Sequence, residues 1–464
     1  GSVVGSPAVT NASGIATITS WTLGNTAGAN SLQASATGLT AVNFTATGTA
    51  GPATQMAVNA GDGQSATVGT AVAVDPAVLV RDAFNNPVAG VSVTFAVTGG
   101  GGAVVGSPAV TNASGIATIT SWTLGNTAGA NSLQASATGL TAVNFTATGT
   151  AGAATQLAFT VQPSNTVAGA AITPAIQVTA RDAFGNTATG FAQNVQLTIG
   201  DNPPGNGALD GTTTVAPVAG VATFSAVDID EAGTGYTLVA DRQGGPPITT
   251  ATSAPFNITV GAATQMTISA GDGQSATVGT AVATDPSVLV RDGANNPVAG
   301  VSVTFAVTGG GGAVVPTTAI LTNASGIATV TSWTLGAAPG ANTLQATSGA
   351  ITPVNFTATG TVGPATQMTI SAGDGQMAAA GSVVTAPAVL VRDALNNPIE
   401  GVSVTFTVTA GDGSISPASP AIVQTNASGV ASLTTWTLGI TPGPNTVRAT
   451  SAGLSAVDIT ATGT

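Results

Sequence analysis

Hydrophobic and polar residues alternate with a period of two along several short stretches of the chain. In the segment 91–98, valine or phenylalanine occupies every second position, and serine, threonine or alanine fills the positions between. Successive side chains of a strand point to opposite faces, so this segment is predicted to be a β-strand with one buried face and one threonine-rich face. The pattern recurs at 301–308 and 402–409, and a further strand is predicted at 143–147. Branched Thr and Val favour the pleated surface, and no helical periodicity lies between these stretches.

Turn-forming residues separate the alternating stretches. The segment 82–87 combines Asp, Asn and Pro, whose side chains bond nearby amides or fix φ. The segment 111–115 reads as a hairpin turn in which Gly115 takes a positive φ. Such signals recur every 8–15 residues or so, which predicts six to eight short antiparallel strands in each repeat.

One stretch, 116–124, changes phase. Ala117 and Ile119 fall on one face of an ideal strand, whereas Trp122 and Leu124 fall on the other. A β-bulge between the two pairs would bring all four side chains to the core. The tryptophan is then the largest core residue of a domain that contains few aromatics.

Internal repetition sets the domain organisation. Residues Val3–Gly51 recur without a change at Val104–Gly152, and the period along the chain is about 100–110 residues. This length suits one small sandwich and is too long for a solenoid coil. Residues 1–51 read as the C-terminal half of a repeat, as in a window taken from a longer array. Whole repeats are predicted at 52–151, 152–260 (divergent), 261–362 and 363–464. The landmarks are the pairs Arg81-Asp82, Arg181-Asp182, Arg291-Asp292 and Arg392-Asp393, together with Trp21, Trp122, Trp333 and Trp436.

Composition excludes several classes of function. The chain contains no Cys and no His, and its only basic residues are six arginines, against 18 acids. Disulfides, thiol nucleophiles, the usual general base and lysine cross-links are therefore excluded. A formal charge of −12 disfavours binding to nucleic acid, and no apolar run is long enough to insert into a membrane. We expect no enzyme activity and no cofactor.

Two motifs resemble a known family. They are V-R-D-A-F-N-N-P-V-A-G-V-S-V-T-F at 80–95 and T-N-A-S-G-I-A at 111–117. In this order they resemble the bacterial immunoglobulin-like repeats of the invasin and intimin type. The resemblance covers every repeat except the divergent one, which is similar to a different bacterial Ig-like subtype. It implies all-β stalk domains of extracellular adhesins, without catalytic residues. The cysteine-containing lectin-like tip of that family has no counterpart in this chain.

Several side-chain groups were weighed as sites. The Arg-Asp pairs recur at one position, so we interpret them as strand ends at which Asp closes a turn. The glycine runs 99–102 and 309–312 precede no helix and are interpreted as hairpin loops. Carboxylates such as Asp62, Asp82 and Asp272 lie in glycine-rich turns without the spacing of a calcium loop. The best calcium candidates are Asp228, Asp230 and Glu231, although a solvated acidic edge is the default interpretation.

The remaining expectations concern the core and the surface. Core side chains are predicted to be Phe95, Phe305 and Phe406 together with the four tryptophans, Trp21, Trp122, Trp333 and Trp436. Among the Asn-X-Ser/Thr sequences, Asn144 and Asn355 should face solvent as candidate glycosylation sites. The sparsely charged Thr- and Ser-rich surface favours association with identical chains or neighbouring repeats.

The sequence therefore predicts an all-β array of immunoglobulin-like β-sandwiches forming an extended rod outside the cell or on its surface. The leading functional hypothesis is the structural repeat region of a bacterial filament or adhesin stalk. The alternative is an extracellular module that binds glycan or a partner protein.

Overall fold

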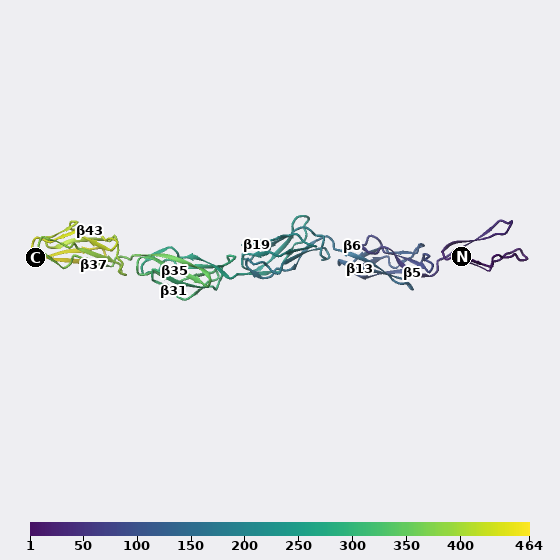
Figure 1. The fold of residues 1–464 in the computed structure, drawn as a ribbon, viewed down its shortest axis with the longest axis horizontal. Helices are drawn as coiled ribbons and strands as arrows, with labels where there is room; N and C mark the ends of the chain where they lie inside the picture. The colour runs from purple at the N-terminus through teal and green to yellow at the C-terminus, as the bar shows by residue number, and fades with distance from the viewer.

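The computed structural model describes all residues, 1–464, and every regular element in it is a β-strand. Figure 1 shows four sandwiches following one another along a single axis, with an open unit at the N-terminal end. No helix is present, so none is available to cross a membrane. The all-β tandem architecture predicted from the sequence is therefore confirmed.

The first sandwich shows how one repeat is built. A five-stranded sheet, in the order β10-β8-β13-β14-β6, faces a three-stranded sheet in the order β11-β7-β5, and β9 and β12 form a separate pair. All neighbours are antiparallel except β6 and β14, which run parallel with Gln64 opposite Ala147. The strands are β5 (Ala53–Ala60), β6 (Gln64–Thr67), β7 (Ala77–Asp82), β8 (Ser92–Gly99), β9 (Gly102–Val105), β10 (Ala109–Val110), β11 (Ile116–Thr118), β12 (Ser121–Leu124), β13 (Gly129–Ser136) and β14 (Val143–Thr150).

This arrangement corrects two expectations. The repeat has more strands than six to eight, and one pairing is parallel, because its first strand breaks after Ala60 and β6 crosses to the opposite sheet. The phase change at 116–124 is not a bulge. β11 pairs with β7, whereas β12 pairs with β9, so the chain changes sheets between Thr118 and Ser121. Each short strand then points its own apolar face to the core.

The other sandwiches follow the same plan. In the third and fourth, the five-stranded sheets are β28-β36-β35-β30-β32 and β38-β47-β46-β41-β43. The strands of the third are β27 (Ala263–Ala270), β28 (Gln274–Thr277), β29 (Ser287–Asp292), β30 (Ser302–Gly309), β31 (Ala313–Val315), β32 (Ile320–Leu321), β33 (Ile327–Thr329), β34 (Ser332–Thr334), β35 (Gly340–Ser348) and β36 (Ile351–Thr361). Those of the fourth are β37 (Gln367–Ala372), β38 (Gln376–Ala378), β39 (Val383–Val384), β40 (Ala388–Arg392), β41 (Ser403–Ala410), β42 (Ser414–Ser416), β43 (Ala421–Gln424), β44 (Val430–Ser432), β45 (Thr435–Thr437), β46 (Gly443–Thr450) and β47 (Val457–Gly463).

The second, divergent sandwich divides its strands among smaller sheets and replaces tryptophan with tyrosine. Tyr236 is fully buried, its ring centroid lies 6.1 Å from that of Phe256, and its hydroxyl donates to the Glu231 carbonyl. Burial is the main cause that raises the pKa of Tyr236 to about 12. The strands are β15 (Gln156–Val161), β16 (Thr166–Val167), β17 (Ile176–Arg181), β18 (Val195–Ile199), β19 (Leu209–Gly211), β20 (Thr214–Val215), β21 (Val221–Phe224), β22 (Val227–Ile229), β23 (Gly233–Tyr236), β24 (Leu238–Arg242), β25 (Ala251–Thr252) and β26 (Phe256–Thr259).

Each sandwich has its own hydrophobic core. Four clusters of buried side chains lie between the paired sheets, and the fully buried members of each belong to one sandwich; across a junction, only the partly buried Ala294 packs against the cluster of the preceding sandwich. Trp122, Trp333 and Trp436 are fully buried at equivalent places, and Phe95, Phe305 and Phe406 are at most 3% exposed. In the first sandwich Phe95 packs against Phe145 at a centroid distance of 6.1 Å. The proposed division at 52–151, 152–260, 261–362 and 363–464 places one cluster in each segment.

The open unit contains only β1 (Ser2–Val4), β2 (Ser20–Thr22), β3 (Gly28–Ala34) and β4 (Val42–Gly48), arranged as two hairpins. Figure 1 shows the two hairpins splayed apart. Phe44 is 51% exposed, although the identical position in the first sandwich, Phe145, is fully buried. Trp21 is only half-buried and faces a groove of about 600 Å³. Trp21 thus departs from the predicted core set, because no counterpart of β5–β8 covers it.

Candidate functional site: the interdomain junctions

The Arg-Asp motif lies at the end of each sandwich that faces the preceding unit. In the first sandwich β7 ends at Asp82, whose side chain is 2% exposed. Its Oδ1 accepts hydrogen bonds from the amides of Phe84 and Asn86, both at 2.9 Å. Asp82 therefore closes the turn, and Asn85 within it takes a left-handed φ of 68°, which asparagine tolerates.

The second oxygen of the Asp82 carboxylate bonds a residue outside the strands of its own sandwich. Asp82 Oδ2 accepts a hydrogen bond of 2.8 Å from the amide of Gly51, in the linker that enters the domain. It also accepts one of 2.9 Å from Asn86 Nδ2. The carboxylate thus joins the turn of its own domain to the linker. Hydrogen bonds to a charged acceptor are the stronger kind.

Asn86 reaches further, into the preceding unit. Its Nδ2 donates to the carbonyl of Asn25 at 2.8 Å, and its Oδ1 accepts from the amide of Ala27, also at 2.8 Å. The side-chain amide of Asn86 therefore forms hydrogen bonds with one backbone donor and one backbone acceptor of the same turn. We call the carboxylate–linker bond and these two amide bonds together the clasp.

The complete clasp recurs at the next two junctions. Asn186 bonds the carbonyl of Asn126 and the amide of Ala128, and Asn296 bonds the carbonyl of Asp230 and the amide of Ala232, all at 2.8 Å. Asp182 and Asp292 hold the linker amides of Gly152 and Gly261 at 2.9 and 2.8 Å.

The last junction differs in one respect. Asn397 Nδ2 donates to the Ala337 carbonyl at 2.8 Å, and Asp393 accepts from Gly363 at 3.1 Å. The position that corresponds to Ala27 is Pro339, which has no N–H to donate. This clasp therefore has one interdomain amide bond where the others have two.

Small apolar contacts accompany the clasp. A Cβ placed on Gly69 would lie 3.0 Å from the ring of Phe184, which follows Asp182 in the next sandwich. Gly69 also takes a φ of 73°, so two constraints favour glycine there. Leu395 occupies the same place against Gly279, and Ala294 faces Gly169 more loosely at 3.4 Å.

The clasp lowers the pKa of three of its carboxyls, those of Asp82, Asp182 and Asp393. The side-chain amide of Asn86 is the main cause that lowers the pKa of Asp82 to about 2, helped by the amides of Gly51, Asn86 and Phe84. For Asp182 and Asp393 burial opposes ionisation, but the hydrogen bonds outweigh it and the pKa of each is lowered. The clasp therefore holds ionised carboxylates at ordinary pH.

The acidic run of the divergent repeat contributes backbone to a clasp. The carbonyl of Asp230 accepts from Asn296, while its carboxylate accepts from the amide of Ala208 at 2.8 Å. Burial, together with Asp210 and Asp230, raises the pKa of Asp228. No three acidic side chains come close enough together to hold a metal ion, so the calcium assignment to Asp228, Asp230 and Glu231 gains no geometric support.

Two further sets of predicted residues lie away from the junctions. Asp62 Oδ1 accepts from the amide and hydroxyl of Thr146, which ties the turn before β6 to β14. Asn144 and Asn355 lie exposed in mid-strand, and their Oδ1 atoms accept from Gln134 and Gln345 at 3.0 Å. Glycosylation of these two asparagines stays a prediction.

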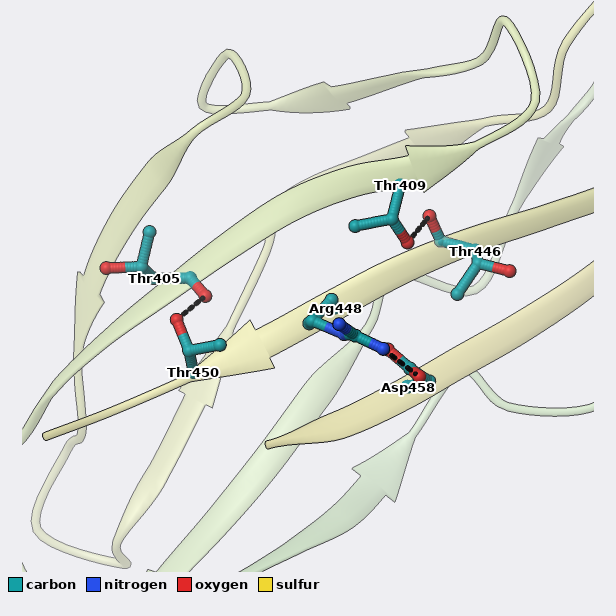
Figure 2. A network of polar contacts seen from close by, with 6 residues as sticks. All are labelled: Thr405, Thr409, Thr446, Arg448, Thr450 and Asp458. Atoms are coloured by element: carbon teal, nitrogen blue, oxygen red, sulfur yellow. Dashed lines mark hydrogen bonds and ion pairs between the residues drawn. The ribbon is translucent and has the colours of Figure 1, made fainter. Parts of the chain in front are cut away.

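In the fourth sandwich an ion pair occupies the place of the exposed Gln–Asn pair of the first and third sandwiches. Arg448 on β46 and Asp458 on β47 form two hydrogen bonds of 2.7 Å, as Figure 2 shows. Thr409 and Thr450 bond neighbouring backbone carbonyls on the same sheet face, so the face remains rich in threonine (Figure 2).

Sequence reasoning found the Asp of the clasp but assigned it only to its own turn. It missed the role of Asn86 and the backbone turn at Asn25–Ala27. The available signal was the joint recurrence of Asp, of Asn four residues later, and of a glycine in every linker, at Gly51, Gly152, Gly261 and Gly363.

Comparisons with known proteins were made once this geometry was established. Paired sheets around separate cores, joined end to end, make the chain a tandem array of immunoglobulin-like domains. No family model and no curated protein matches the chain.

Three similar solved structures illustrate the likeness. FdeC, an Escherichia coli adhesin, is 16% identical, and the match covers 68% of this chain and 99% of that one at a TM-score of 0.35. Yersinia pseudotuberculosis InvD is 20% identical, covering 64% and 94% with a TM-score of 0.34. Invasin, a bacterial integrin-binding protein, is 17% identical, covering 88% and 78% with a TM-score of 0.32. At such identities the likeness concerns the fold alone.

Proposed function

We propose that this chain is an extracellular spacer, a clasped rod that holds other parts of a bacterial surface adhesin or filament away from the cell. The observation that carries the proposal is the clasp. Each junction joins two successive units through directional hydrogen bonds to a buried or half-buried Asp and Asn, rather than through a free linker.

The physical argument rests on linker length and bond direction. Only a few residues separate β14, which ends at Thr150, from β15, which begins at Gln156, and Gly152 among them is bonded to Asp182. A flexible polar linker would let successive domains reorient freely. One loop, the Asp–Asn turn, bonds both the linker and a turn of the preceding unit. These bonds limit bending and rotation of one domain relative to the next, as a spacer requires.

The surface and composition agree with a role outside the cell. A sparsely charged Thr- and Ser-rich chain without Cys or Lys depends on its cores and ladders alone. The resemblance of the repeat motifs to invasin-type domains points to a bacterial surface, and FdeC, one of the similar structures, is itself an adhesin. The proposal includes association of the rod with identical chains, because a surface with few charges repels other copies only weakly.

The proposal is tested by small-angle scattering and negative-stain imaging of the whole chain. A spacer gives extended particles of uniform length whose dimensions change little with salt, because most of the clasp bonds are part-buried and the interdomain bonds of the asparagines join uncharged groups. Particles bent at random at every junction would overturn the spacer role. Long fibres of defined axial repeat would support self-association. Dispersed single rods would rule out self-association but leave the spacer role intact.

A further inference from the structure

The last junction lacks one bond that the other three junctions have. Asn86, Asn186 and Asn296 each accept a hydrogen bond from a backbone amide of the preceding unit at 2.8 Å. At the last junction the corresponding residue is Pro339, and Asn397 accepts no hydrogen bond from the preceding sandwich.

The linker bond of the last clasp is also longer than at the other junctions. The linker bond from Gly363 to Asp393 is 3.1 Å, against 2.8–2.9 Å at the other junctions. The apolar contact uses Leu395 on Gly279, a smaller side chain than Phe184 on Gly69 but a larger one than Ala294 on Gly169. Nothing at this junction replaces the missing donor, since Asn397 bonds otherwise only to Asp393 and to the Ala337 carbonyl.

We infer that the junction between the third and fourth sandwiches is a built-in hinge, at which the rod bends while its other joints stay straight. The cause is chemical: the tertiary amide nitrogen of Pro339 carries no hydrogen to donate, so the side-chain amide of Asn397 bonds the preceding sandwich through its Nδ2 alone. Two hydrogen bonds from one side chain to a turn prevent that turn from rotating relative to the side chain. A single hydrogen bond leaves the turn free to rotate about that bond. Loss of one such bond raises the open fraction of the joint roughly two- to tenfold.

A hinge at this place gives the spacer one preferred point of bending, which lets the fourth sandwich swing about a straight remainder. The inference rests on the proposed spacer role but is separable from it. If every joint bends widely, the spacer role fails. If every joint is equally stiff, only the hinge fails.

The experiment compares two joints of the full chain. Because the chain has no cysteine, pairs of labels can be placed on introduced cysteines without first removing a native one. Ser325→Cys with Ser428→Cys reports across the last junction, and Ser114→Cys with Val218→Cys reports across the junction of the first and second sandwiches; all four positions are exposed. Pulsed electron resonance or single-molecule fluorescence then gives the distance distribution across each joint.

Two reciprocal variants assign the cause. Pro339→Ala restores a donor and should narrow the distribution at the last junction to that of the reference joint. Ala128→Pro removes a donor from the reference joint and should broaden it; a proline occupies this position at Pro339, so the turn accommodates one. Asn186→Leu serves as a second variant should the proline alter the turn, and unchanged melting of each sandwich shows that the folds persist. Equal widths at the two joints, or no response to Pro339→Ala, would overturn the hinge.

Discussion

At the residue scale, a junction depends on one carboxylate whose two oxygens accept hydrogen bonds from different segments. Asp182 Oδ1 accepts from amides of its own turn, and Oδ2 accepts from the linker amide of Gly152. Asn186 then connects the same turn to the preceding sandwich. Two short side chains therefore decide how one domain is placed on the next.

Removing the asparagine should loosen a joint without unfolding either domain. Asn186→Leu deletes both bonds to the first sandwich, which should weaken the closed joint by about 2 kcal/mol. Distance distributions across the joint measure the effect. Gln134→Ala, which breaks an exposed pair far from any junction, is the matched control. A joint equally narrow in Asn186→Leu and wild type would contradict the clasp.

The clasp should also fail in acid. The pKa of Asp82 is lowered to about 2, so the ionised carboxylate contributes stability that is fully present above its ordinary pKa near 3.8. That contribution is lost as pH falls from about 4 through 2. Scattering curves should therefore be constant from pH 7 to pH 4 and show bending below it. Bending that begins above pH 5 would point to a different group.

The repeated tryptophan gives a prediction with an internal control. Trp122→Ala removes a fully buried indole and should destabilise the first sandwich by about 3–5 kcal/mol. Trp21→Ala, in an identical stretch of sequence, should have almost no effect because Trp21 lies on an open face. Denaturant unfolding of the two variants measures the difference, and similar losses from both would refute this account of the core.

At the element scale, strands that change sheets hold each sandwich together. β5 and β6 belong to opposite sheets although they are nearly continuous in sequence, and β11 and β12 divide in the same way. The apolar positions of the two short strands can then both face the core. This explains why a segment that breaks strand periodicity is nevertheless fully buried at Ala117, Ile119, Trp122 and Leu124.

The ion pair between β46 and β47 tests how much the exposed sheet face contributes. Arg448 and Asp458 occupy the place of the Gln–Asn pairs in the other repeats, and both are well exposed. Replacing them with Gln and Asn together should leave the melting temperature of the fourth sandwich nearly unchanged and abolish its salt dependence. Salt titrations of melting measure this. A large drop in stability at low salt and high salt alike would show that the pair is structural.

At the scale of the whole molecule, four separate cores should unfold one at a time. Stretching a single chain should give four events, each releasing about 100 residues or roughly 350 Å of contour length. No cystine or lysine cross-link shortens that length, because the chain contains neither residue. The open unit should add no resolved event. Fewer, longer events would show that neighbouring sandwiches unfold together, and the proposed boundaries would then need revision.

The sequence by itself determined the strands, the repeats and the all-β class. Alternation of Val and Phe with Thr is a local property, and a strand needs only one apolar face to be recognised. Asp82 as a turn-closing residue was predicted for the same reason, since its partners lie within four residues.

Only the tertiary structure decided what lies between the domains. The partners of Asn86 are about sixty positions away, in a backbone turn whose carbonyl and amide carry no side-chain signature. Sheet switching at β11 and β12 likewise depends on which neighbour each strand meets. Trp21 and Trp122 make the point most directly, since identical local sequence leaves one half-buried and buries the other. Burial and junction geometry depend on distant segments, and periodicity within a segment says nothing about them.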